Sequence, residues 1–309
     1  MIKTIFVALA VGALAVGAVA MAGCQTTSTA PARTQIIDAI SGGARGSRDD
    51  ARALKRQSDE RLAARNYLGA MDARWQMLDI RSKSTSMLGA LTAFAIQSLA
   101  LGDLAPIVSH LDAAACRRYA ARLKDFDARS PTYTVLLERQ KADALSQIRQ
   151  LTRDPQEWQK TVAGLRFSPQ ERQTLQKTPG SQIEKNIEKI YQAAQIQSKK
   201  PYSNQPINIS VDAYTKIFAS PSELQKFIVA KYRTDRLLIV AALQKRADRL
   251  EKKTSESLPL DPFGSGPFKV KGDLIYSVGP DAKDDGGRTV PVPTRAQPTD
   301  KGDIPAPIF

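Results

Sequence analysis

This chain of 309 residues has one histidine, two cysteines and 31 Asp or Glu that could carry out covalent or acid–base catalysis, but their pattern does not specify a catalytic site. A nucleophile–histidine site would have to use His110, because it is the single histidine. His110 follows Ile107 and Val108 beside an apolar stretch, which favours a packed or capping role. Glu138 follows three apolar residues in a predicted helix and should be half buried, but acid–base work also requires a partner near the substrate. The sequence contains no glycine-rich phosphate loop, nucleophile elbow or zinc motif, so no catalytic residue is predicted.

The two cysteines, Cys24 and Cys116, have different surroundings. Lys3 and an apolar run over residues 5–20 precede the sequence Met21-Ala22-Gly23-Cys24. Small residues after such a run are typical of the signal peptide of an exported chain. Cys116 follows three alanines and should be a small buried thiol.

The cysteine directly after Ala-Gly makes this segment resemble the signal of a bacterial lipoprotein. The resemblance implies that residues 1–23 are removed and that Cys24 carries a diacylglyceryl group and an acyl chain such as palmitate. Several acyl chains anchor a protein durably, because each buried methylene contributes about 0.8 kcal/mol. Gln25 implies an outer-membrane location facing the periplasm. The alternative is an uncleaved transmembrane helix, since the run approaches the length of about 18 residues that spanning requires.

The composition changes at residue 258, where short blocks rich in Asp, Gly and Pro begin. Alternating apolar residues on both sides of Lys271-Gly272-Asp273 predict a short β-hairpin. The blocks are Asp261-Pro262-Phe263-Gly264, Tyr276-Ser277-Val278-Gly279-Pro280-Asp281, Gly286-Gly287 and Gly302-Asp303-Ile304. Their order and spacing resemble the C-terminal region of the major pseudopilin of type II secretion.

In the pseudopilin family the loops after the hairpin bind calcium, so the resemblance implies a structural calcium site at Asp281, Asp284, Asp285 and Asp303. Calcium takes six to eight oxygen ligands, and glycine-rich loops let carbonyl groups turn inward. A solvated polar loop is the alternative for these carboxylates. The chain departs from the family at its N-terminus, which lacks the prepilin leader and assembly helix. It is more similar to a loosely defined set of exported bacterial proteins that join a helical domain to such a tail.

Between residues 47 and 257 the pattern is helical, and we expect a mainly α fold with a small C-terminal hairpin and loop subdomain. Cap residues followed by Pro or Glu predict helix starts at Ser130, Asp154, Ser168, Ser181 and Ser220. Residues 87–101 and 237–243 are apolar nearly all round, which indicates buried helices. The predicted organisation is a signal peptide (1–23), a flexible tether (24–46), a helical domain (47–257) and the tail (258–309).

Arginine and lysine recur through residues 45–65, close after the predicted anchor. One interpretation is a helix that binds anionic headgroups, since each nearby basic residue contributes about 1 kcal/mol at such a surface. The alternative is a solvated helix face balanced by Asp49, Asp50, Asp59 and Glu60.

The net charge of +14 favours anionic partners. Residues 258–309 hold six Lys or Arg and seven Asp, so the helical part carries the positive excess. Export and few aromatic residues make nucleic acid an unlikely partner and redirect the charge toward membrane, envelope proteins or anionic polymers. We therefore expect a membrane-anchored, non-enzymatic binding or scaffold module. The alternative is a hydrolase of an envelope polymer, which a pocket with two facing carboxylates would favour.

Overall fold

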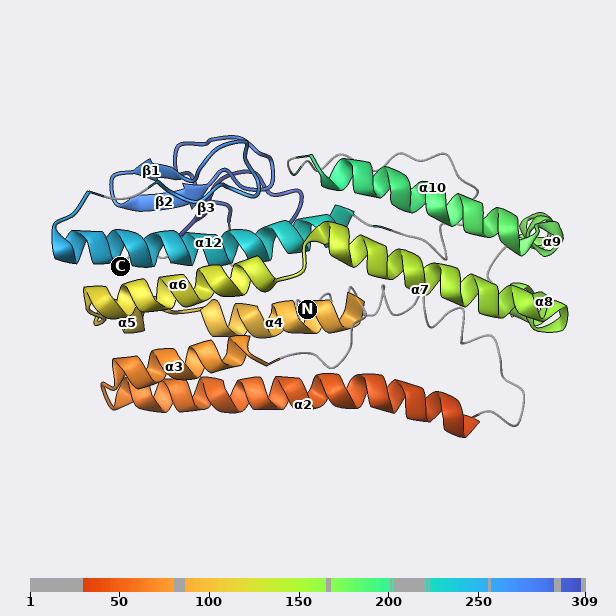
Figure 1. Ribbon diagram of the computed structural model, residues 1–309, viewed down its shortest axis with the longest axis horizontal. Coiled ribbons are helices and arrows are strands. Elements are labelled where there is room, and N and C mark those ends of the chain that lie inside the picture. The colour runs from red at the N-terminus through yellow and green to blue at the C-terminus, as the bar shows by residue number, and fades with distance from the viewer. Residues whose placement is uncertain are drawn as a thin grey trace. The chain divides into compact units, whose positions relative to one another are not determined.

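The computed structural model describes residues 30–80, 87–164, 168–200, 202, 221, 223–254, 257–291 and 296–306. Helices run through the chain up to residue 251, and a small sheet follows (Figure 1). The expected mainly α fold with a C-terminal hairpin subdomain is therefore confirmed. The chain divides into two compact units. Residues 136–197 form most of the described part of one, here called the α7–α10 unit, and residues 37–135 and 223–306 that of the other, the α12 unit.

The α12 unit is built around α12 (Glu223–Glu251), its last helix along the chain. α6 lies along α12, α4 also contacts it, and the sheet covers another side of the helix (Figure 1). The other helices are α2 (Ala30–Ala63), α3 (Tyr67–Leu78), α4 (Met87–Leu101), α5 (Ala105–Val108) and α6 (Ala113–Arg129). α12 is thus covered on several sides, which explains why its stretch Leu238–Leu243 is apolar all round and buried.

One hydrophobic cluster joins the helices of this unit. Its fully buried side chains come from α3, α5, α6 and α12, and include Trp75, Ile107, Leu123, Val240 and Leu243. Phe94, Ile96 and Leu101 of α4 are also buried, as the apolar run over residues 87–101 predicted. This continuous core holds α4, α5 and α12 firmly against each other.

The tail forms a three-stranded antiparallel sheet in the order β1-β2-β3. Its strands are β1 (Lys269–Lys271), β2 (Leu274–Ser277) and β3 (Ile304–Pro305). Val270 lies opposite Ile275, and Gly272, with a φ of 60°, occupies the turn. This confirms the predicted hairpin. Ser277 lies opposite Ile304 across the β2–β3 pair, which the sequence pattern did not predict.

The tail and α12 share one core. Phe227, Leu238 and Ala241 of α12 cluster with Phe263 and Ile275 of the tail. The sequence placed a domain boundary between residues 257 and 258, whereas the compact units place the tail together with α12. The reason is that β2, β3 and the loops bury apolar side chains against the helix, because the small sheet has no second layer of its own.

The α7–α10 unit contains the helices α7 (Tyr133–Arg153, of which residues 133–135 belong to the α12 unit), α8 (Pro155–Gly164), α9 (Pro169–Lys177) and α10 (Gly180–Ser198). The predicted stripe on α10 is buried and comprises Ile183, Ile187, Ile190, Tyr191 and Ala194. The side chains of Arg149 on α7 and Glu184 on α10 form an ion pair of 2.8 Å, and Glu184 directly follows Ile183 of this stripe.

The helix starts test the predicted caps. Ser168 begins α9 with a complete capping box, and the Asp154 carboxylate accepts from the Gln156 backbone N–H at 2.8 Å, as expected. Two starts differ from prediction. α10 begins at Gly180, because the Pro179 carbonyl already accepts the first helical bonds. Ser130 instead ends α6, and α7 begins at Tyr133. The start near Ser220 lies outside the described residues, and α12 is described from Glu223.

The predicted signal peptide and Cys24 also lie outside the described residues. The backbone is helical from Ala30, so residues 30–46, expected as part of the flexible tether, belong to α2. Residues 34–41 contain three isoleucines and no proline, which permits the helix to extend toward the N-terminus. In the part of the chain that the structure describes, no helix combines the length and apolar character needed to cross a membrane.

Candidate functional site

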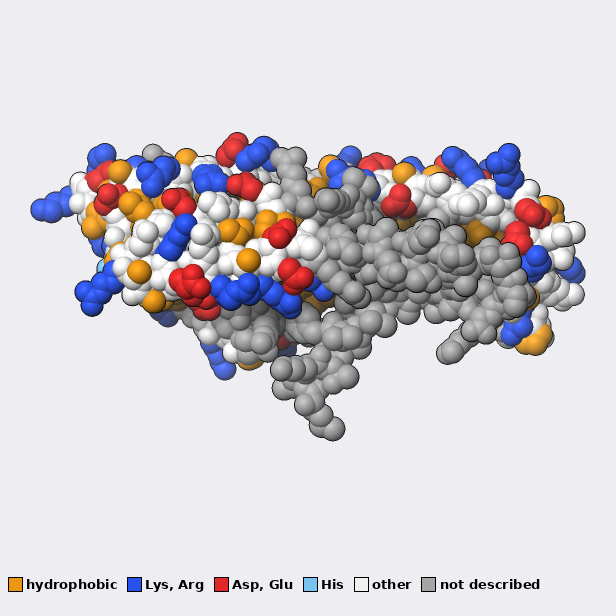
Figure 2. Space-filling model, turned by 90° about the horizontal axis from the view of Figure 1, so that it is seen from below, with side chains coloured by type: hydrophobic (Ala, Val, Ile, Leu, Met, Phe, Trp, Pro, Cys, Tyr) orange, Lys and Arg blue, Asp and Glu red, His pale blue; other side chains and the backbone are white. Residues whose placement is uncertain are grey.

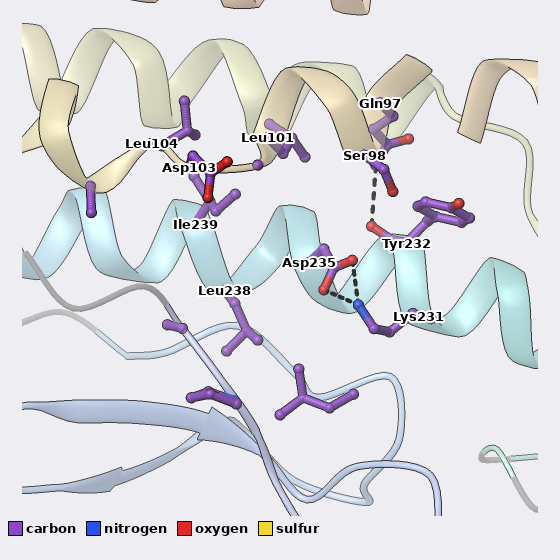
Figure 3. Close-up of a pocket in the computed structure, with 15 residues that line it drawn as sticks. Gln97, Ser98, Leu101, Asp103, Leu104, Lys231, Tyr232, Asp235, Leu238 and Ile239 are labelled. Atoms are coloured by element: carbon purple, nitrogen blue, oxygen red, sulfur yellow. Dashed lines mark hydrogen bonds and ion pairs between the residues drawn. The ribbon is translucent and has the colours of Figure 1, made fainter. Parts of the chain in front are cut away.

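A cavity of about 340 Å³ opens in the α12 unit, between the end of α4, the middle of α12 and strand β3 (Figure 3). The sequence did not predict it, because its walls come from three distant parts of the chain. Its lining residues are Gln97, Ser98, Leu101, Gly102, Asp103, Leu104, Ala105, Lys231, Tyr232, Asp235, Leu238, Ile239, Ile304, Pro305 and Ala306. This volume lies at the lower end of the range for small-molecule sites.

A buried arginine fixes the wall between α4 and α5. Arg74 is 1% exposed, and its guanidinium donates to the backbone carbonyls of Leu99 at 2.8 Å and Gly102 at 3.1 Å. Burial lowers the pKa of Arg74, while the charges of Asp59 and Asp103 oppose that shift. The end of α4 leaves carbonyl groups without helical partners, and Arg74 binds two carbonyls there. The turn into the cavity is therefore held from inside the core.

Asp103 follows that turn in a left-handed conformation, with a φ of 52°. Aspartate tolerates this region better than most residues because its short side chain can bond locally. In Figure 3 the Asp103 carboxylate lies between the end of α4 and α12, beside Ile239. Asp103 is exposed, and it makes no hydrogen bond or ion pair to the residues that the structure describes. The mouth of the cavity thus carries a carboxylate that, among the described residues, interacts with Arg74 through its charge.

The polar groups on α12 are paired with one another. The Lys231 ammonium donates to both carboxyl oxygens of Asp235, at 2.6 and 2.7 Å. Burial raises the pKa of Asp235, and the charge of Lys231 opposes that shift. The Tyr232 ring stacks on Phe94 of α4 with centroids 4.9 Å apart, and its backbone carbonyl accepts from the Gln97 side chain at 3.2 Å (Figure 3). Burial raises the pKa of the Tyr232 hydroxyl. The α12 wall therefore presents a neutralised ion pair rather than a free base.

The remaining wall is apolar. Leu101 and Leu104 face it from the α4–α5 side, Leu238 and Ile239 from α12, and Ile304 from β3. All five side chains are at least 94% buried in the folded chain. A ligand in this cavity would meet an apolar surface on most sides and ionised groups at one edge.

The residues considered for catalysis lie elsewhere. His110 stacks on Tyr67 with ring centroids 4.0 Å apart, at the exposed end of α5. Cys116 is a free, fully buried thiol, as predicted, and burial raises its pKa, which disfavours the thiolate. Glu138 is exposed and accepts a hydrogen bond from Gln195. Its expected half-burial is therefore wrong, because it points away from the buried pair Leu136 and Leu137.

Asp261 joins two of the tail blocks. It is 4% exposed, and its carboxylate accepts from the backbone N–H groups of Phe263 at 2.9 Å and Val278 at 2.8 Å. The Ser277 hydroxyl donates to it at 2.7 Å. Burial raises the pKa of Asp261, and the three donors oppose that shift. The Asp-Pro-Phe-Gly block thus serves to anchor the end of β2.

The other blocks meet on the same side of the sheet. Gly279 has a φ of 72°, and a Cβ there would overlap the carbonyl of Gly302, so the close approach requires glycine. The Asp303 carboxylate, in a fully buried residue, accepts from the Gly287 N–H at 2.6 Å and from the Asp285 N–H at 3.4 Å. Blocks that are separated by up to 23 residues therefore contact each other.

The four carboxylates predicted to bind calcium are only partly brought together. Burial raises the pKa of Asp303, and the charges of Asp284 and Asp285 raise it further. Asp284 accepts from the Tyr276 hydroxyl and from the Gly286 N–H, both at 3.0 Å. Asp281 bonds instead to the backbone of Lys283. As the described side chains stand, no group of three or more His, Cys, Asp or Glu is arranged to hold a metal ion.

The basic segment near the N-terminus has a mixed surface. Over the described part of α2, basic and acidic side chains are interspersed (Figure 2). Lys55 pairs with Asp59 at 2.5 Å and Arg52 with Asp49 at 3.4 Å. Arg61 donates to the Gly69 carbonyl of α3. This pattern favours the solvated helix face over a dedicated headgroup site.

No protein-family model, no curated protein and no solved structure matches this chain. The lipoprotein and pseudopilin resemblances therefore remain predictions from the sequence. The cavity is the candidate site that the described structure adds to them. The sequence signals for it were the Lys231–Asp235 spacing of four residues on one helix and the Gly102-Asp103 break between two apolar helices.

Proposed function

We propose that the chain is a lipoprotein, anchored through Cys24 in the outer membrane, that acts in the periplasm as a non-enzymatic binding or scaffold module. The cavity of the α12 unit is its binding site. The observation that carries this proposal is the ion pair on α12, in which Lys231 donates to both carboxyl oxygens of Asp235. Paired groups can orient a ligand, whereas a general base must be free to take a proton.

Anchoring is tested by labelling cells with a palmitate analogue. The wild-type chain should carry the label and fractionate with the outer membrane, since several acyl chains anchor durably. The variant Cys24→Ser should lose the label and most of its membrane association. Equal labelling of both chains would contradict lipidation at Cys24.

Binding is tested by crosslinking in whole envelopes, with mass spectrometry of the captured molecules. The variant Ala105→Phe adds a large side chain at a half-buried position of the cavity wall. Ala128→Phe makes the same change at an exposed position of α6 and serves as the control. The proposal expects molecules that crosslink to the wild type and to the control but not to Ala105→Phe. Identical capture by all three chains would contradict the cavity as the binding site.

We further propose that the tail binds calcium through Asp281, Asp284, Asp285 and Asp303, as the pseudopilin resemblance implies. The charges of Asp284 and Asp285, which raise the pKa of Asp303, are repulsions that a cation would relieve. Tyr276 and Gly286 both donate to Oδ1 of Asp284, so its Oδ2 is the oxygen that this carboxylate would offer to a cation. Calcium in the tail would supply structural stability beside the cavity and take no part in binding there.

The second candidate is the envelope-polymer hydrolase, because Asp103 and Asp235 line the same cavity. Burial raises the pKa of Asp235, as a general acid requires. Two observations favour binding instead: Lys231 holds both oxygens of Asp235, and a small, largely apolar cavity suits one small group better than a polymer. Release of soluble fragments from purified cell-wall polymer, lost in both Asp103→Asn and Asp235→Asn, would establish the hydrolase.

A further inference from the structure

The cavity has a local charge opposite to that of the chain. The chain as a whole carries +14, whereas the cavity lining contains two carboxylates and one ammonium, or −2 + 1 = −1. Because Lys231 and Asp235 neutralise each other, Asp103 is the carboxylate that stays available at the mouth. A ligand with a positive charge would therefore find a partner here, and an anion would meet repulsion.

The nearest buried cation does not cancel Asp103 for a ligand. Arg74 is 1% exposed, and its guanidinium is committed to Ser58, Asp59 and two carbonyl groups. It supports the turn from behind and does not line the cavity. Arg74 thus positions Asp103 without occupying the space in front of it.

The walls are set before a ligand arrives. Gln97 of α4 donates to the Tyr232 carbonyl of α12 at 3.2 Å and accepts from Arg236 at 2.9 Å. These bonds hold α4 and α12 at a fixed separation, and Arg74 fixes the end of α4 from α3. A preformed site loses little free energy in ordering, so even a small ligand can bind measurably.

Resting on the proposed function, we propose that the cavity binds a small organic cation, with an ammonium group attached to an apolar body. Asp103 accepts the ammonium at the mouth. The apolar body lies against Leu104, Ile239 and Ile304.

The test uses three probes of equal length: hexylammonium, 1-hexanol and hexanoate. Their binding to the full chain is measured by ligand-observed NMR and by calorimetry. Hexylammonium should bind about tenfold more tightly than 1-hexanol, as one charge-assisted hydrogen bond to Asp103 would provide. Hexanoate should show no binding. Ala105→Phe should abolish binding of both hexylammonium and 1-hexanol.

Asp103→Asn separates charge from shape. It should lower the affinity for hexylammonium about tenfold, to the level of 1-hexanol, and leave 1-hexanol unchanged. Asp50→Asn makes the same chemical change at an exposed position of α2 and should alter neither affinity.

Equal binding of hexylammonium and 1-hexanol in the wild type would overturn the proposed selectivity for cations. The same conclusion follows if Asp103→Asn lowers both affinities equally. If no probe binds while crosslinking in envelopes still depends on residue 105, the ligand class is wrong and the proposed function stands. If crosslinking is also independent of residue 105, both are wrong.

Discussion

At the scale of single residues, two buried charged groups hold the backbone in place. Arg74 binds carbonyl groups at the end of α4, and Asp261 binds N–H groups at the end of β2. Each charge is buried at a cost that its hydrogen bonds offset. Removing such a residue leaves several backbone groups without a partner. The substitution should therefore lower the free energy of unfolding more than one at an ordinary surface position does.

Asp261→Ala should destabilise the α12 unit by about 2–4 kcal/mol, because the N–H groups of Phe263 and Val278 and the Ser277 hydroxyl lose their acceptor in a buried site. Asp261→Asn keeps one acceptor oxygen and should cost less. Urea unfolding followed by circular dichroism measures both changes. A loss below about 0.5 kcal/mol for Asp261→Ala, as at an ordinary surface position, would contradict this role.

At the scale of the elements, α12 is tied to α6 by ion pairs at both ends of their contact. Arg117 of α6 pairs with Asp248 and Glu251, at 2.9 and 2.6 Å. Arg236 of α12 pairs with Asp127 of α6 at 2.7 Å, and both side chains are buried. These pairs set the register of the two helices over the apolar contact between them.

Arg236→Met should destabilise the chain by about 3 kcal/mol, because it leaves the buried Asp127 carboxylate with only its longer, exposed pair to Arg233. The double variant Asp127→Leu, Arg236→Met removes both charges and should recover much of that loss. Thermal and urea unfolding of the two single variants and the double variant form the required cycle. Strictly additive losses would show that the pair is not coupled.

The pair at the other end makes stability depend on pH. Hydrogen bonds from Arg117, followed by those from Lys253, lower the pKa of Glu251 to about 2. Because the pKa is lower in the folded than in the unfolded chain, this contribution is present above about pH 4.5 and is lost as the pH falls toward 2. Glu251→Gln should therefore flatten the loss of stability between pH 5 and 3 in urea unfolding. If the free energy of unfolding falls with pH equally steeply in Glu251→Gln and the wild type, the Arg117–Glu251 pair does not contribute to this pH dependence.

At the scale of the whole molecule, the tail is part of the α12 unit and not a separate appendage. Phe263 and Ile275 share a core with Phe227 and Leu238 of α12, and β3 supplies one wall of the cavity. A change of stability in the tail must therefore affect the unit that holds the cavity. This coupling makes global unfolding a suitable measure of events in the tail.

Calcium should raise the melting temperature of the full chain relative to EGTA, because a ligand that binds only the folded state stabilises it, by about 2.7 kcal/mol at one hundred times its dissociation constant. Asp285→Asn, at an exposed carboxylate, should remove the difference. Differential scanning fluorimetry provides the measurement. Superimposable curves with calcium and EGTA would sink the calcium prediction.

The sequence by itself determined the local features of this protein. Helical periodicity and capping residues placed the helices, because both act over a few neighbouring residues. The alternation around Lys271-Gly272-Asp273 gave the hairpin in the same way. Ser130 lies three positions before the start of α7, and Ser181 lies one position after the start of α10. These shifts show how neighbours such as Pro179 move a helix boundary.

Only the tertiary structure decided which of these elements share a core and where a ligand could bind. Asp103, Lys231 and Ile304 are separated by more than 70 residues from one another along the chain, yet they line one cavity. These residues come together because α4, α12 and β3 pack around the cavity, and no local sequence pattern specifies that packing. The same holds for Asp261 and Val278. Their hydrogen bond shows that the Asp261 block anchors the end of β2, which the order of the blocks along the sequence does not reveal. Burial and long-range contact are properties of the folded chain, and therefore the site emerged from the fold.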